Sequence, residues 1–329
     1  MVPRQAAEIR EMTTHRSGVN EAYDVVVVGG GPAGLSAALM LGRCRRRVLV
    51  CDSGRYRNAF SAGVHGFLSR DGIKPLDLVR IARQQLRPYG VRICEAVVKH
   101  ITGRSGRFRV SLESGEHIVA RRVLLATGMT DHVPRIEGID EVYGKSVHHC
   151  PYCDAWEHRD QPLAAYGKGR PGMGLAMSLK TWSADVALLT DGPSRLSASQ
   201  IRQLEVLAIP VRTERIERLV SARGKLQRIV FKNGDSLARR AIFFNTGQNQ
   251  ACDLAARLGC QFTKRGAIKT DRLERTCIPG VFAAGDCSRD AQFVAVAAAE
   301  GAIAAEAINV ELQEEDRLRY LSAKGIVIP

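Results

Sequence analysis

A run of apolar, β-branched residues opens the regular pattern of the chain at residues 23–28. Such a run is typical of a parallel strand that is buried on both faces. A glycine-rich turn follows it at once, and the small residues 35–42 continue as a helix. The turn fits the G-x-G-x-x-G pattern, with Gly29, Gly31, Pro32, Ala33 and Gly34.

A second strand over residues 48–51 ends at Asp52. In this context the glycines let the backbone approach a pyrophosphate at the helix N-terminus, and the acid accepts from a ribose diol. A dinucleotide-binding unit is predicted by this order of features, in which a strand, the glycine turn and a helix are followed by a second strand and an acid.

The same pattern recurs later in the chain. An apolar strand at residues 163–166 leads into Gly167, Gly169 and Gly172, and a strand at 186–189 is followed by Asp191. Two such units predict two dinucleotides in one chain. The alternative for this second copy is a degenerate unit that keeps the fold and has lost the ligand.

Between the two units lies the sequence His-His-Cys-Pro-Tyr-Cys-Asp, residues 148–154. The C-x-x-C pair, Cys150 and Cys153, can close a small disulfide ring, and Asp154 places a proton carrier beside it. A zinc site needs four ligands and only one C-x-x-C is present, so we expect no metal. Inert buried thiols are disfavoured because the surrounding residues are polar and turn-like.

Composition narrows the function classes. A length of 329 residues suggests about two domains, and 45% hydrophobic with 25% charged residues is typical of a globular protein. No apolar run approaches the ~20 residues of a membrane span. The nine cysteines are dispersed and the polar residues 1–20 hold no apolar secretion segment, so we expect a cytoplasmic protein.

The net charge of +14 raises the question of a nucleic-acid partner. The basic residues are spread along the chain, and their short runs at 43–47, 121–122 and 239–240 each precede an apolar segment. We interpret these runs as solvated surface turns, and expect neither a nucleic-acid partner nor a membrane.

The order of these motifs resembles that of the low-molecular-weight thioredoxin reductase family of FAD-dependent pyridine nucleotide-disulfide oxidoreductases. Thr127 and Gly128 are similar to the family's Ala-Thr-Gly segment, and Gly285 and Asp286 belong to a segment that resembles its second FAD motif. There the resemblance implies that the Asp bonds the ribityl chain of FAD. The resemblance covers residues 22–312.

The resemblance implies an electron path from NAD(P)H through FAD and the cysteine pair to a thioredoxin-like protein or a small disulfide. Cys153 corresponds to the sulfur next to the flavin, Cys150 to the interchange thiol and Asp154 to the acid/base. His148 and His149 are candidates for sharing the proton transfer, with plain surface positions as the alternative.

The implied fold is α/β, with two Rossmann-like three-layer nucleotide-binding domains, the second inserted in the first. Short crossings near Pro134 and Gly247 form its hinges, and a homodimer is usual in the family. The expected limits are an N-terminal tail at 1–21, the FAD-binding domain at 22–131 and 248–329, and the NAD(P)-binding domain with the redox pair at 132–247.

Two further segments take their expected places from the resemblance. The loop that holds Asn58 and His65 runs beside the flavin ring, and the Ala-rich residues 292–308 form a helix whose N-terminus points at the flavin. Each also has a plain structural alternative, as a polar connection and as a core helix.

Three departures from the family leave alternatives open. The cationic His-Arg-Arg segment that selects NADPH is absent at residues 190–195, so Asp191 favours NADH or the site is unused. The Arg-Gln after the second FAD motif is also absent. The Trp-Glu sequence shortly after Asp154 is similar to that of a branch of the family that includes dithiol oxidases. In that branch a His commonly occupies the position of Asp154. The alternatives are therefore a dithiol oxidase that uses oxygen, and a flavin-bound redox sensor without turnover.

Overall fold

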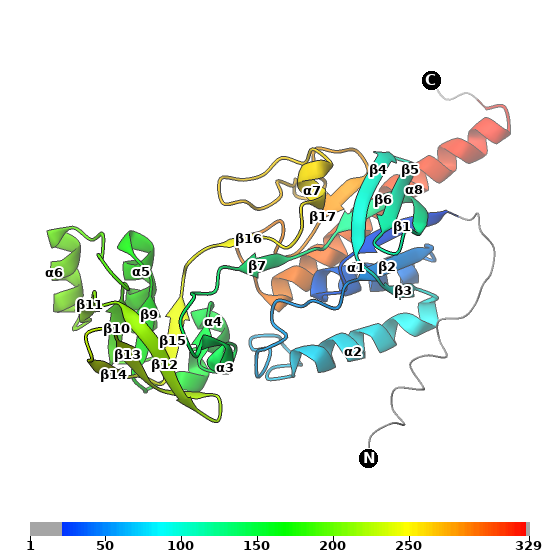
Figure 1. The fold of residues 1–329 in the computed structure, drawn as a ribbon. Coiled ribbons are helices and arrows are strands. Elements are labelled where there is room, and N and C mark those ends of the chain that lie inside the picture. Colours follow the sequence, from blue (N-terminus) through cyan, green and yellow to red (C-terminus); the bar gives the residue numbers. More distant parts are fainter. Residues whose placement is uncertain (1–21, 327–329) are drawn as a thin grey trace, which may run out of the picture.

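Residues 22–326 are described by a computed structural model, in which two units are joined by a pair of short strands (Figure 1). The expected N-terminal tail, residues 1–21, lies outside the described residues, as do residues 327–329. No helix within residues 22–326 is long and apolar enough to cross a membrane.

The first unit is built on a seven-stranded sheet with the order β3-β2-β1-β6-β5-β4. Strand β17 adds to it by pairing in parallel with the C-terminal half of β6. Strands β1, β2, β3, β6 and β17 run parallel, while β4 and β5 form an antiparallel extension. The bounds are β1 (Tyr23–Val28), β2 (Val48–Asp52), β3 (Arg92–Glu95), β4 (Val98–Arg104), β5 (Arg107–Leu112), β6 (His117–Leu125) and β17 (Val281–Ala283).

Strand β1 is buried on both faces, as its unbroken apolar run predicts. Val25 and Val27 pack into the core under the helices, whereas Val26 and Val28 pack into the core on the opposite face. The expected buried parallel strand is therefore confirmed.

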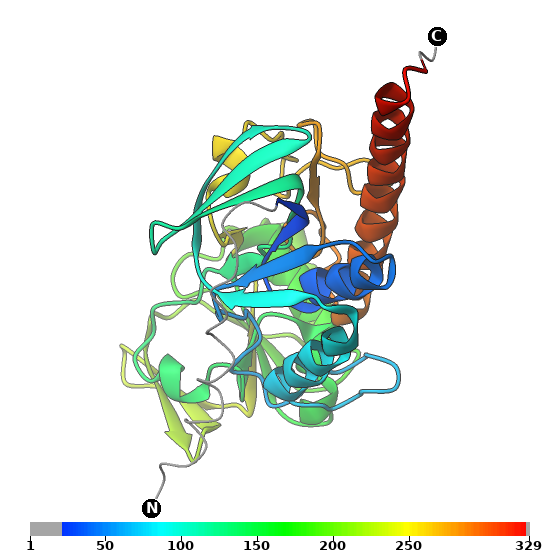
Figure 2. The same cartoon turned by 90° about the vertical axis from the view of Figure 1, so that its right-hand side faces the viewer.

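Helices α1 (Pro32–Arg43) and α2 (Pro75–Leu86) cover one face of this sheet together with α8 (Val294–Ala323) (Figure 2). Helices α1 and α8 touch backbone to backbone, since a Cβ added at Gly301 would lie 2.1 Å from the Ala33 carbonyl oxygen. The opposite face carries β4, β5 and the short helix α7 (Leu254–Arg257). A 3₁₀ turn, η2 (Arg87–Tyr89), follows α2.

Helix α8 is longer than the sequence pattern predicts. It begins at Val294 and continues past residue 308 to Ala323. Its second half alternates acids with arginines, and pairs such as Arg319 with Glu315 lie one turn apart. Ion pairs at this spacing support a helix where the Ala-rich apolar pattern has ended.

The second unit holds a five-stranded parallel sheet with the order β11-β10-β9-β15-β8. Helices α5 (Gly169–Leu179) and α6 (Ala198–Val206) cover one face, and an antiparallel three-stranded sheet covers the other. The parallel strands are β8 (Val147–His148), β9 (Leu163–Tyr166), β10 (Val186–Leu189), β11 (Val211–Arg212) and β15 (Ala241–Phe244). The covering sheet is β12 (Ile216–Ala222), β13 (Lys225–Phe231) and β14 (Ser236–Ala238).

The chain leaves the first unit through β7 (Met129–Asp131) and returns through β16 (Gln248–Gln250). These two strands pair antiparallel, with Asp131 opposite Gln248, and they form the connection seen between the units in Figure 1. Because β17 and α8 return to the first sheet, the second unit is inserted in the first. The α/β fold with two Rossmann-like units is thus confirmed, while the exact domain limits at 131/132 and 247/248 stay predictions.

The prediction that all the arginine runs are surface turns is wrong. Arg121 and Arg122 lie within β6 and are only 8% and 6% exposed, and Arg239 is buried as well. The Arg121 guanidinium binds Asp24, and the Arg122 guanidinium binds Glu311 of α8. A buried charge is tolerated where it is paired and hydrogen-bonded, and each of these arginines has an acidic partner, which for Arg239 is Asp185.

Candidate functional site

The first glycine turn leads from β1 into α1 and is closely packed everywhere except at one position. A Cβ at Gly29 would lie 2.1 Å from the Ala126 carbonyl oxygen, and a Cβ at Gly34 would lie 2.0 Å from the Gly29 carbonyl oxygen. A Cβ at Gly31 would meet nothing within 4 Å. Gly31 precedes α1 directly, with Pro32 and Ala33 in its first turn. The turn therefore offers open backbone at a helix N-terminus, which fits the pyrophosphate of FAD.

Asp52 lies where the sequence predicts, at the end of β2, but its carboxylate already has donors within the protein. It accepts from the Gly54 N–H at 3.0 Å, the Tyr56 hydroxyl at 2.5 Å and the Arg83 guanidinium at 2.7 Å. Burial acts to raise the pKa of Asp52, yet these hydrogen bonds hold it below its ordinary value. Its contact with a ribose stays a prediction.

The second FAD segment lies against the first glycine turn. A Cβ at Gly285 would be 2.9 Å from the Ala33 side chain, and the Gly285 N–H donates to the buried Glu300 carboxylate at 2.7 Å. Glu300 in turn binds the Arg289 guanidinium at 2.6 Å. These contacts hold the backbone next to Asp286 in place at the start of α8.

The Thr127–Gly128 segment follows β6, between β1 and β17 in the sheet. Gly128 adopts a positive φ of 70°, and a Cβ there would meet nothing within 4 Å. The structure thus brings together both predicted FAD segments and the Ala-Thr-Gly segment, and the glycines present fit FAD.

Cys150 and Cys153 form a disulfide with their Cα atoms 5.3 Å apart. Cys150 is the N-cap of the short helix α4 (Pro151–Asp154), and its sulfur accepts from the Cys153 N–H at 3.2 Å. A donor aimed at this sulfur stabilises a thiolate in the reduced state, which favours Cys150 as the nucleophile. Tyr152 between them is 73% exposed.

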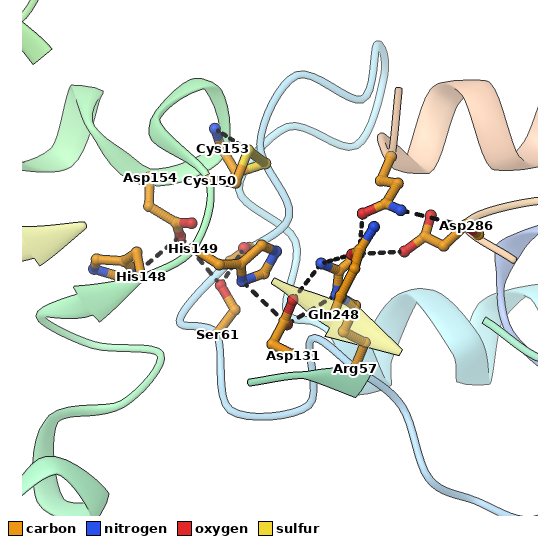
Figure 3. Close-up of a disulfide and its surroundings, with 12 residues drawn as sticks. Arg57, Ser61, Asp131, His148, His149, Cys150, Cys153, Asp154, Gln248 and Asp286 are labelled. Carbon is orange, nitrogen blue, oxygen red and sulfur yellow. Dashed lines mark hydrogen bonds and ion pairs between the residues drawn. A yellow bond between two sulfur atoms is a disulfide. The ribbon is translucent and has the colours of Figure 1, made fainter. Parts of the chain in front are cut away.

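Asp154 follows Cys153 in α4 and is largely buried, with its carboxylate directed toward His148 and Ser61 (Figure 3). The Ser61 hydroxyl lies 3.4 Å from its carboxylate, and so does the His148 Nδ1 atom. Burial, with a smaller contribution from Glu157, raises the pKa of Asp154 to about 6. A carboxyl with this pKa holds and releases a proton near neutral pH, as an acid/base must.

The two histidines before the pair have different surroundings. His148 is buried, its ring stacks on Phe243, and its Nε2 atom lies 3.1 Å from Nε2 of His158 in the 3₁₀ turn η3 (Trp156–His158). Burial lowers the pKa of His148 to about 3. His149 instead places Nδ1 3.5 Å from Asp131, and burial lowers its pKa as well. The surface alternative is wrong for His148, and His158 is a neighbour that the sequence pattern did not mark.

The second glycine turn leads from β9 into α5 and has one backbone donor in use. Gly167 and Gly172 pack tightly, since a Cβ at Gly172 would lie 2.5 Å from the Gly167 backbone. The Gly169 N–H donates to the Ser194 carbonyl at 2.8 Å. One backbone donor that a pyrophosphate needs is therefore already in use.

Asp191 likewise has protein partners. Its carboxylate accepts from the Ile216 N–H at 2.8 Å and from the Tyr166 hydroxyl at 3.2 Å, and Arg215 lies 3.8 Å away. Its predicted contact with a ribose diol stays a prediction.

The loop after β2 lies against the inserted unit. The half-buried Asn58 accepts from the Ser61 N–H through its backbone carbonyl, and His65 lies 3.5 Å from Glu157. The residue that sequence reasoning missed is Arg57, whose guanidinium binds both Asp131 and Asp286 (Figure 3). The available signal was a basic residue directly before Asn58 in the loop assigned to the flavin.

Comparison with known proteins agrees with this geometry. Residues 23–301 match the family model described as pyridine nucleotide-disulphide oxidoreductase. The chain is 32% identical to a protein of Arthroderma benhamiae that bears the name probable thioredoxin reductase, over 91% of this chain and 82% of the relative. It is 30% identical to a thioredoxin reductase of Claviceps purpurea, over 88% of this chain and 94% of the relative. The solved structure of HlmI is 37% identical, with a TM-score of 0.88 over 94% of this chain and 99% of that one.

Proposed function

Because the chain belongs to the pyridine nucleotide-disulphide oxidoreductase family and resembles thioredoxin reductases over most of its length, we propose that it is an FAD-dependent disulfide oxidoreductase. In this proposal electrons pass from NAD(P)H through FAD and the Cys150–Cys153 pair to a thioredoxin-like protein or a small disulfide. A homodimer and a cytoplasmic location accompany the proposal as predictions from the family resemblance.

The observation that carries the proposal is the placement of the disulfide. Cys150 and Cys153 lie on the inserted unit, where Asp154 contacts Ser61 and Tyr152 contacts Phe293 of the first unit. Phe293 directly follows Gln292, which shares the Arg57 guanidinium with Asp286. The redox pair thus lies against the unit whose glycines fit FAD.

FAD, when bound, would supply a carrier that can accept a hydride and exchange two electrons with the cysteine pair. The chain would hold it with Gly31, Gly128 and Asp286. Cys153 is assigned to exchange electrons with the flavin, and Cys150 to attack the substrate disulfide. Asp154 is assigned to protonate the leaving thiolate and to take the proton back, because its pKa of about 6 suits both directions.

One observation favours a second candidate function, a dithiol oxidase that passes electrons from a small dithiol to oxygen. At the second glycine turn the Gly169 N–H donates to the Ser194 carbonyl. It would have to leave this partner to bind the pyrophosphate of a nicotinamide dinucleotide. An enzyme that uses no nicotinamide has no such requirement.

An anaerobic titration separates the two candidates. Flavin absorbance is followed while NADH, NADPH and dithiothreitol are added in turn to the purified holoprotein. Rapid bleaching by a nicotinamide supports the reductase and identifies its coenzyme. Bleaching by the dithiol alone, reversed by air with formation of peroxide, supports the oxidase.

The variants Cys150→Ser and Cys153→Ser are the matched controls for this titration. Disulfide turnover that survives both substitutions would exclude both candidate enzymes. If no reductant bleaches the flavin, the remaining candidate is a flavin-bound redox sensor without turnover.

A further inference from the structure

Arg57 lies at the place where the two units and the predicted flavin site meet. Its side chain is 14% exposed, although it belongs to the loop that follows β2. A guanidinium has five N–H donors, and here each has an acceptor. The acceptors are Asp131 for Nε and Nη2, Gln248 for Nη2, and Asp286 and Gln292 for Nη1.

These acceptors come from two different places in the fold. Asp131 and Gln248 are the paired residues of the crossover strands β7 and β16, through which the chain enters and leaves the inserted unit. Asp286 and Gln292 lie between β17 and α8, in the second FAD segment. One side chain thus joins the crossover to the predicted flavin site (Figure 3).

Asp131 extends this connection into the inserted unit. It is 5% exposed, and His149 places Nδ1 3.5 Å from its carboxylate. The Tyr143 hydroxyl also bonds it, and burial with this neighbour raises the pKa of Tyr143 to about 12. His149 directly precedes Cys150 in the chain, and polar contacts run from His149 through Asp131 and Arg57 to Asp286.

We propose that Arg57 acts through Asp131 as a latch between the two units, a positioning residue that holds Asp131 where it contacts the inserted unit and so keeps the disulfide toward the flavin. This inference rests on the proposed function for its consequence, since the disulfide must face the flavin to exchange electrons. Turning the inserted unit away breaks the contacts that His149 and Tyr143 make with Asp131, whose carboxylate Arg57 holds in place. The hydrogen bonds between Arg57 and Asp131 are charge-assisted and largely buried. They therefore favour the orientation in which the disulfide faces the flavin.

Arginine is required at this position for a geometric reason. The planar fork presents two parallel donors to Asp131 while its third nitrogen binds Asp286 and Gln292. A lysine has a single nitrogen and cannot span acceptors on opposite sides. We therefore expect Arg57→Lys to behave like Arg57→Gln.

The test compares Arg57→Gln and Asp131→Asn with Arg55→Gln. Arg55 is exposed in the same loop, so its variant controls for loss of a positive charge. The readout of orientation is the tryptophan emission lifetime of the oxidised holoprotein, because the two tryptophans of the chain, Trp156 and Trp182, both lie in the inserted unit and bound flavin quenches them with distance. A second readout is the rate at which dithiothreitol bleaches the flavin through the cysteine pair.

We expect longer tryptophan lifetimes and about tenfold slower bleaching in Arg57→Gln and Asp131→Asn, with Arg55→Gln unchanged. Arg57→Gln also removes the contact with Asp286, so this variant could lose FAD. In that case Asp131→Asn tests the latch, because it changes only the contact at the crossover strands. Lifetimes in Asp131→Asn equal to those of Arg55→Gln would overturn the latch. If dithiothreitol does not bleach wild-type flavin through the cysteines, the proposed function fails, while the lifetimes still decide the latch.

Discussion

Gly144 of the inserted unit lies directly against the backbone of Phe60 in the first unit. A Cβ added at Gly144 would be 2.4 Å from the Phe60 carbonyl oxygen, and Gly144 adopts a positive φ of 73°. The neighbouring Tyr143 ring lies 6.0 Å from the Phe60 ring. The two units therefore meet through a backbone contact that no side chain can enter.

Gly144→Ala is expected to weaken this contact between the units. The added methyl group forces the Phe60 loop away, and the strained φ adds to the loss, so we expect a destabilisation of about 1–3 kcal/mol. Thermal unfolding measures the loss, and dithiol bleaching of the flavin should also slow. The control is Gly115→Ala, where φ is 87° but a Cβ would meet nothing within 4 Å. Equal effects in both variants would mean that strain alone acts at residue 144.

Gly31→Ala and Gly34→Ala are expected to separate cofactor binding from folding. A methyl group at Gly31 meets no protein atom within 4 Å, so the fold should keep its stability while FAD affinity falls at least about tenfold. A methyl group at Gly34 would lie 2.0 Å from the Gly29 carbonyl oxygen and should destabilise the protein itself. Calorimetry of the FAD-free protein and FAD titration measure the two quantities. Full FAD affinity in Gly31→Ala would contradict the assignment of this turn.

Asp154→Asn is expected to lower disulfide turnover by about 10²-fold or more, because the group that carries the proton is lost. The wild-type rate profile should show a titration near pH 6 that the variant lacks. Stopped-flow measurement of the dithiol half-reaction between pH 5 and 8 tests this. A pH profile shared by both proteins would remove Asp154 from the proton transfer.

The same substitution should change how stability depends on pH. The folded-state pKa of Asp154 is raised from 3.8 to about 6, so its favourable contribution is present below about pH 4 and is lost as the pH rises through 6. Asn keeps the neutral form at every pH. We expect the free energy of unfolding of Asp154→Asn, relative to that of wild type, to rise by about 2–3 kcal/mol from pH 4 to pH 8. Urea unfolding at both pH values measures this difference. A constant difference across this range would show that the carboxyl titrates normally.

His148 should act in the opposite direction. Its folded-state pKa is lowered from 6.5 to about 3, so the unfolded chain binds the proton first and stability falls as the pH drops below 6.5. His148→Gln should flatten this dependence between pH 7 and pH 5, as urea unfolding will show. His117, an exposed histidine hydrogen-bonded to Ser111, provides the matched control for loss of an imidazole through the variant His117→Gln.

Much of the fold follows from local sequence signals. The apolar run of β1 and the glycines at 29, 31 and 34 act within a few residues of one another, so their pattern alone predicts strand, turn and helix. The cysteine pair is also local, because Cys150 caps the turn that contains Cys153. These features were predictable for that reason.

The missed features depend on partners distant in sequence. Arg57 meets acceptors at residues 131, 248, 286 and 292, and Arg122 meets Glu311. No window along the chain contains both a donor and its acceptor in these cases. An arginine run therefore has the same local pattern whether it is solvated or buried against a helix that follows much later.

The insertion also has a consequence for how the chain folds during synthesis. Every strand of the five-stranded sheet lies within residues 147–244, whereas β17 and α8 of the first sheet extend over residues 281–323. The inserted unit can therefore close while the ribosome is still making the last segment, and until then Arg122 of β6 lacks its α8 acceptors Glu311 and Glu315. The contact between Arg122 and Glu311 joins residues far apart in the chain, so it forms only when α8 has been made. The C-terminal helix is thus the step that ends the assembly of the FAD-binding unit.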